Sequence, residues 1–162
     1  MFILKESTEI IELGREIKVV GLSLQKSGLS ISFDSLGKLW GIYGETYRGK
    51  NKIKNEENLV TEYAVLLNRV PDYITGCSVS DIVEVNEECS SFVIPKGKYI
   101  KDTFNAETFE ILANEVLVKR NVKAWAKKNK VKIDGLFTIE VYPWEEFDNN
   151  NFEMYTLTPI KE

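Results

Sequence analysis

The chain has 162 residues and a formal net charge of −4 at pH 7, and 43% of its residues are hydrophobic and 28% are charged. This length and balance are typical of one globular domain and exclude a disordered chain. Sequence-independent nucleic-acid binding depends on neutralising phosphates. We therefore expect no direct contact between this acidic domain and nucleic acid.

Histidine is absent, and cysteine occurs only as Cys77 and Cys89. The absence of histidine excludes Ser-His-Asp and Cys-His catalysis and histidine-ligated zinc. The cysteines form no CxxC pair, which favours a reducing compartment. No apolar run reaches the roughly 20 residues that span a bilayer, and residues 1–6 lack the basic start of a signal peptide. We expect a cytoplasmic protein with no cofactor, no bound metal and no membrane contact.

The N-terminal half is predicted to contain two extended segments, 8–13 and 17–25, which are separated at Gly14. A helix is predicted for residues 33–49, because aromatic and apolar residues recur there at steps of three and four. These residues are Phe33, Leu36, Trp40, Tyr43 and Tyr47. The stripe indicates that one side of the helix packs on a sheet or lines a ligand site.

Strand-like runs follow at 62–69 and 73–85, with a proline turn between them. A further extended stretch is predicted for residues 91–104. The second helix is predicted to begin after Asn105, which is a suitable N-cap, and to end at about Lys128, where lysines are favourable.

The chain ends with predicted strands at 136–142 and 152–160. The order strand, helix, strand, strand thus occurs twice. It predicts an α+β fold with duplicated βαββ units, as pseudo-repeats of about 8–86 and 87–162 within a single domain of residues 1–162. Such units place helices on one face of an antiparallel sheet and leave a ligand cleft between the halves.

The strand at 136–142 carries an acidic residue among aromatic residues. Alternation places Thr138, Glu140 and Tyr142 on one face of the strand, opposite an apolar face. An acid beside Tyr142 and before Trp144 suits a pocket for a cationic or polar aromatic molecule, because the acid supplies charge and the rings supply area and cation–π attraction. The alternative is an ordinary exposed glutamate on a half-buried strand.

Five short stretches occur in an order that is shared with a known family. They are Glu9-Ile10-Ile11-Glu12-Leu13, Val19-Val20-Gly21-Leu22, Leu39-Trp40, residues 137–143 and residues 155–160. Through them the chain resembles the GyrI-like small-molecule-binding domain, which is also the effector-binding domain at the C-terminus of multidrug-responsive transcription regulators. Gly14 departs from the pattern, since members of this family often have proline there.

The resemblance implies two βαββ units with a ligand pocket between them and a carboxylate on the penultimate strand, which corresponds to Glu140. The implied aromatic wall consists of Trp40, Tyr43, Tyr63, Tyr142 and Trp144. Trp40 and Tyr43 also fit core packing, because they lie on the apolar stripe of a helix. Tyr63 shares a strand face with Val65 and fits core packing as well.

The resemblance further implies a bacterial, stand-alone protein that binds hydrophobic, cationic or planar aromatic small molecules. It would act as a sensor or sequester a toxin, with a separate regulator or protein as partner. Two alternatives stay open. One is a hydrolase that opens the cyclopropane ring of DNA-alkylating natural products, with Glu140 as general base and Tyr63 or Tyr142 as proton donor. The other is a protein-interaction module of the gyrase-inhibitor type.

Overall fold

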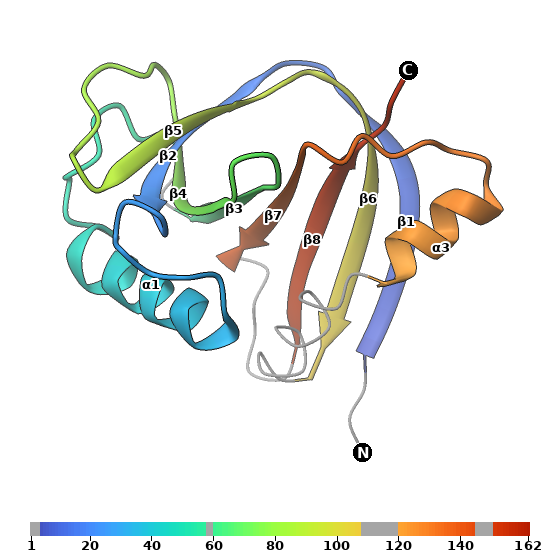
Figure 1. The fold of residues 1–162 in the computed structure, drawn as a ribbon, viewed down its shortest axis with the longest axis horizontal. Coiled ribbons are helices and arrows are strands. Elements are labelled where there is room, and N and C mark those ends of the chain that lie inside the picture. The colour runs from blue at the N-terminus through green and yellow to red at the C-terminus, as the bar shows by residue number, and fades with distance from the viewer. Residues whose placement is uncertain (1–3, 58–59, 108–119, 145–150) are drawn as a thin grey trace.

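The fold is an eight-stranded sheet with helices packed against it (Figure 1). The computed structural model describes residues 4–57, 60–107, 120–144 and 151–162. The strands are β1 (Leu4–Leu13), β2 (Ile17–Ser23), β3 (Thr61–Leu67), β4 (Asp72–Val79), β5 (Cys89–Ile94), β6 (Gly97–Ala106), β7 (Phe137–Pro143) and β8 (Phe152–Pro159), and the helices are α1 (Phe33–Thr46) and α3 (Arg120–Lys128).

The strand order is β1-β6-β8-β7-β3-β4-β2-β5, and every neighbouring pair is antiparallel. The predicted α+β class with an antiparallel sheet is therefore confirmed. The triplets β2-β4-β3 and β6-β8-β7 have the same internal order, as pseudo-repeats would require. The duplication and the cleft between the halves stay predictions.

Three boundaries differ from the sequence-based prediction. The stretch predicted for 91–104 is divided between β5 and β6, because Pro95 lacks an N–H donor and Gly97 has a φ of 142°. The strand predicted for 73–85 ends at Val79. The N-cap predicted at Asn105 is wrong, since this residue lies in β6 opposite Glu153. The N-terminal part of the predicted second helix, residues 108–119, lies outside the described residues.

A two-stranded ribbon runs over the top of the sheet (Figure 1). β1 continues into β2 and β5 continues into β6, while β1 pairs with β6 and β2 pairs with β5. A hydrophobic core lies on the sheet face beneath this ribbon, and its buried members are Val19, Val65, Ile74, Ile94, Tyr99, Phe137, Ile139, Val141 and Leu157.

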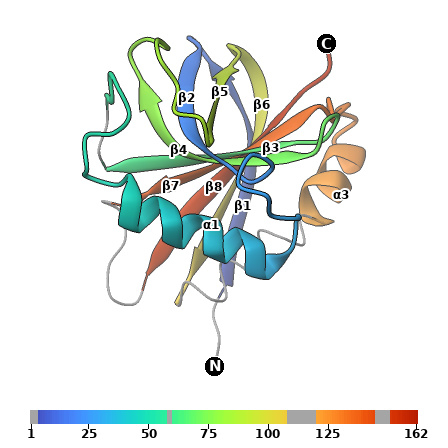
Figure 2. The ribbon, with the colours of Figure 1, turned by 60° about the vertical axis from the view of Figure 1, so that its left-hand side comes forward.

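The two helices of the described residues pack against the other face of the sheet (Figure 2). Helix α1 begins after Ser32, whose hydroxyl accepts a hydrogen bond from the Ser35 amide at 3.2 Å, as an N-cap does. Its aromatic stripe joins the larger core, which also contains Phe104 of β6. Helix α3 packs on Ile100 of the same strand. Since residues four apart in a strand point the same way, both helices cover one face.

Two glycines allow β2 and β4 to lie unusually close together. Gly21 and Gly76 are direct partners across the two strands. A Cβ atom on Gly76 would lie 2.0 Å from the carbonyl oxygen of Val20, so no larger residue fits without moving the backbone.

Among the described helices, none is long and apolar enough to cross a membrane.

Candidate ligand-binding site

A buried carboxylate lies on the helix-covered face of β7. Glu140 is 3% exposed, and its Oε1 accepts hydrogen bonds from the hydroxyl groups of Tyr73, at 2.7 Å, and Tyr142, at 2.8 Å. The Tyr73 hydroxyl in turn accepts a hydrogen bond from Trp40 Nε1 at 3.0 Å. One network thus connects α1, β4 and β7 through the carboxylate.

The two tyrosines that contact Glu140 are protonated hydrogen-bond donors at neutral pH. Burial raises the pKa of Tyr73 and Tyr142 well above 10, and the charge of the nearby Glu140 raises both further. The hydrogen bond from the indole of Trp40 acts in the opposite direction and lowers the pKa of Tyr73. Since the phenols keep their protons at neutral pH, both can donate to the carboxylate and orient it.

Aromatic rings form a continuous array next to Glu140. Tyr142 stacks on Trp144 with ring centroids 5.6 Å apart and meets the edge of Trp40 at 5.1 Å. Trp40 in turn meets Tyr43 edge-to-face at 6.2 Å. The tyrosines are buried and both indoles are half-buried. The indoles are therefore the parts of the array that a molecule from solution can contact first.

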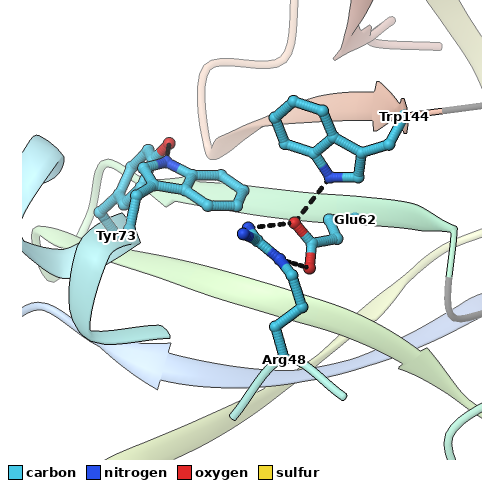
Figure 3. Close-up of polar contacts among 5 residues, drawn as sticks. Arg48, Glu62, Tyr73 and Trp144 are labelled. Carbon is cyan, nitrogen blue, oxygen red and sulfur yellow. Dashed lines mark hydrogen bonds and ion pairs between the residues drawn. The ribbon is translucent and has the colours of Figure 1, made fainter. Parts of the chain in front are cut away.

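A second buried carboxylate lies on the same face, on β3 (Figure 3). Glu62 is 3% exposed and lies directly opposite Tyr142 in the pairing of β3 with β7. Its Oε2 accepts a hydrogen bond from Arg48 Nε at 2.8 Å, and its Oε1 accepts from Arg48 Nη2 and Trp144 Nε1, both at 2.6 Å. The geometry is a bidentate guanidinium–carboxylate pair supported by an indole donor.

The guanidinium of Arg48 also lies over two aromatic rings. Its Cζ is 5.7 Å from the ring centroid of Tyr43 and 5.7 Å from that of Trp144, within the range of cation–π attraction. The hydrogen bond to Glu62 raises the pKa of Arg48 above its ordinary value. Arg48 is therefore a permanent cation bound by an acid and by aromatic faces.

Five of the predicted site residues lie together on the helix-covered face, and they are Glu140, Tyr142, Trp40, Tyr43 and Trp144. Tyr63 is not among them. It lies opposite Val141 and packs with the core on the other face, where burial raises its pKa to about 12. There it borders a hollow of about 580 Å³ that also contains Ser78. The geometry gives no support to Tyr63 as a neighbour of Glu140.

Three residues of this site were not predicted from the sequence: Glu62, Tyr73 and Arg48. The pattern around Glu62 resembles that around Glu140, because both are acids within alternating strands, and this signal could have identified it. No comparable signal marks Tyr73 or Arg48, since their roles depend on strand pairing and on where α1 ends. Within the described part of the chain, no group of three or more acidic, cysteine or histidine residues could hold a metal ion.

An antiparallel sheet with helices on one face is the architecture of a class of effector-binding domains. The chain belongs to the Cass2 family of integron-associated effector binding proteins, whose family model matches residues 9–156. The predicted relationship to GyrI-like effector-binding domains is thereby confirmed. No curated protein matches the sequence.

Solved structures with the same fold include three of particular interest. The integron cassette protein Cass2 from the mobile metagenome of Vibrio cholerae is 15% identical, with a TM-score of 0.55, over 96% of this chain and 99% of that one. SAV2435 bound to tetraphenylphosphonium is 13% identical, with a TM-score of 0.65, over 96% and 94%. EcmrR, in a complex with DNA, is 14% identical, with a TM-score of 0.63, over 98% of this chain and 58% of that one. At these identities the likeness shows the shared fold.

Proposed function

We propose that the protein binds hydrophobic organic cations, including planar aromatic ones, on the face formed by Glu140 and the aromatic array. The observation that carries the proposal is a carboxylate that is 3% exposed and is oriented by two tyrosine hydroxyls. The tetraphenylphosphonium bound to SAV2435, a protein of the same fold, supports this ligand class.

The charge of Glu140 lies in a buried environment. A carboxylate shielded from water attracts a cation more strongly than an exposed one, because the effective dielectric constant is lower. The half-buried indoles of Trp40 and Trp144 offer apolar area and ring faces to the organic part of the ligand. Selectivity should therefore depend on both positive charge and aromatic or apolar surface.

The biological role that fits this chemistry is a sensor or a sequestering protein. As part of this proposal, a separate regulator or protein partner transmits the signal of ligand binding. Cys77 and Cys89 are both buried free thiols, which suits the reducing cytoplasm. We therefore place the protein, as part of this proposal, in the bacterial cytoplasm.

The test is a tryptophan-fluorescence titration of the wild type and Glu140→Gln with tetraphenylphosphonium and with neutral pyrene. We expect saturable quenching by the cation that weakens about 10-fold or more in the variant, the effect of losing a charge-assisted contact, and little change for pyrene. Glu84→Gln is the matched control, because it removes the same charge at an exposed site. Equal cation affinities in Glu140→Gln and Glu84→Gln would overturn the proposal.

Recovery of the ligand separates a binding protein from a hydrolase. Mass spectrometry after incubation with a cyclopropane-containing alkylating compound should return the compound unchanged if the protein only binds it. A product with the mass of one added water, formed by the wild type and lost in Glu140→Gln, would instead establish the hydrolase. Of the two donors considered for that reaction, Tyr142 contacts Glu140.

A further inference from the structure

We propose that Glu62, Tyr43 and Trp144 form a second cation subsite, which Arg48 fills in the unliganded protein and from which a ligand with two cationic groups displaces it. The inference rests on the proposed function, because the second cationic group belongs to a ligand that is already held at Glu140. The ligand class is then an aromatic dication, and Arg48 is the residue that selects dications over monocations.

The guanidinium of Arg48, which fills the subsite, shows which chemical group the subsite binds. The guanidinium of Arg48 makes two hydrogen bonds to Glu62, at 2.8 and 2.6 Å, and lies 5.7 Å from the ring centroids of both Tyr43 and Trp144. A carboxylate with two aromatic faces around a cation is the arrangement by which proteins bind organic cations. The chain therefore contains an internal example of the ligand group that this subsite accepts.

Arg48 can leave the subsite, whereas Glu62 cannot. The side chain of Arg48 is 45% exposed and that of Glu62 is 4% exposed. Arg48 follows Tyr47, the C-cap of α1, so its guanidinium can turn into solvent without disturbing the helix. Glu62 stays buried after that movement and keeps only the hydrogen bond from Trp144. It then attracts another cation, because a buried carboxylate that loses its ion-pair partner is left with an uncompensated charge.

The positions of the two carboxylates set the spacing of the ligand's charges. Glu62 lies opposite Tyr142, and Ala64, two residues further along β3, lies opposite Glu140. The carboxylates are thus diagonal neighbours on one face of two paired strands, a relation that separates residues by about 7–8 Å. A rigid aromatic dication whose two charges lie at opposite ends of two directly joined rings matches this spacing.

The ligand pair for the test is benzyl viologen, a bipyridinium dication, and N-benzyl-4-(4-benzylphenyl)pyridinium, its monocationic counterpart, in which a benzene ring replaces one pyridinium ring and both benzyl groups are kept. We compare their affinities for the wild type, Arg48→Met, and Arg48→Met with Glu62→Gln. Arg48→Met should strengthen dication binding by about 10-fold or more, well beyond its effect on the monocation. The gain should disappear in the double variant, since Glu62 no longer carries charge.

Lys54→Met is the matched control, because it removes one positive charge from an exposed ion pair with Glu84. An equal gain for both ligands in Arg48→Met, a gain no larger than in Lys54→Met, or a gain that persists in the double variant would each overturn the subsite. Those results would show an effect of net charge alone.

An NMR measurement on the wild-type protein tests the subsite without depending on the stability of the variants. The chain has four arginines, so the side-chain Nε–H signal of Arg48 can be assigned in an NMR spectrum by its loss in Arg48→Lys. The dication should move this signal to the position of solvated arginines, and the monocation should leave it in place. Dication binding with an unmoved Arg48 signal overturns the subsite alone, whereas no Glu140-dependent binding of either ligand overturns the proposed function as well.

Discussion

Replacing Tyr73 with phenylalanine removes one hydroxyl group from the centre of the Glu140 network. That hydroxyl donates to Glu140 at 2.7 Å and accepts from Trp40 at 3.0 Å. A hydrogen bond to a charged group contributes about 1.5–3 kcal/mol and a neutral one about 0.5–1.5 kcal/mol. Glu140 keeps its bond from Tyr142, which limits the loss. We expect Tyr73→Phe to lower the free energy of unfolding by about 2–3 kcal/mol.

Urea unfolding followed by far-UV circular dichroism measures this loss, since tryptophan fluorescence would itself respond to a change beside Trp40. The control is Tyr99→Phe, whose hydroxyl donates to the carbonyl of Pro95 and should contribute about 1 kcal/mol. The denaturant dependence should stay constant if both variants fold to the same structure. A loss in Tyr73→Phe that does not exceed the loss in Tyr99→Phe would refute the reasoning.

A double-mutant cycle sharpens the test. Tyr73 and Tyr142 donate to the same oxygen of Glu140, so removal of the second hydroxyl should cost more than removal of the first. We expect a coupling of about 0.5 kcal/mol or more between Tyr73→Phe and Tyr142→Phe. Additive losses would show that the two hydroxyls act independently.

Two further predictions concern the stability of the sheet. Asp102 is fully buried, and burial, together with a hydrogen bond and charge from Glu6, raises its pKa to about 7. The folded protein therefore binds a proton that the unfolded chain, with a pKa near 4, releases. The free energy of unfolding should therefore decrease as the pH rises from about 4 to about 7, by at most about 1.4 kcal/mol per pH unit. Asp102→Asn should abolish this contribution. Equal pH profiles of the wild type and the variant in urea unfolding would contradict the prediction. Gly76→Ala should cost about 3 kcal/mol or more, because its Cβ would clash with β2. Gly37→Ala in α1 meets no atom within 4 Å and should stabilise by up to about 1 kcal/mol; similar thermal midpoints for the two variants would refute the close approach.

The sequence-based prediction was most successful where one element determines the answer. The stripe on α1 correctly placed Trp40 and Tyr43 against the sheet, because helical periodicity is a local property. The alternation in β7 correctly separated Glu140 from the apolar face. Both results follow from the spacing of side chains along one continuous segment.

Strand register accounts for what could not be predicted. Glu62 and Tyr63 are neighbours in sequence, but they lie on opposite faces of β3. Which of them accompanies Glu140 depends on the pairing of β3 with β7, and a shift of one residue would exchange them. Tyr73 reaches Glu140 only because β4 follows β3 in the sheet. Local patterns carry no information on these pairings.

The two carboxylates of the site are held by different kinds of donor, and this difference has a chemical consequence. A tyrosine hydroxyl orients a carboxylate without cancelling its charge, whereas a guanidinium orients it and cancels the charge as well. Tyr73 and Tyr142 donate hydroxyl hydrogen bonds to Glu140, and the guanidinium of Arg48 forms an ion pair with Glu62. Under the proposed displacement, movement of the half-exposed side chain of Arg48 would leave the charge of Glu62 uncompensated. We therefore expect the proposed binding face to accept ligands with one or two cationic groups without any rearrangement of the sheet.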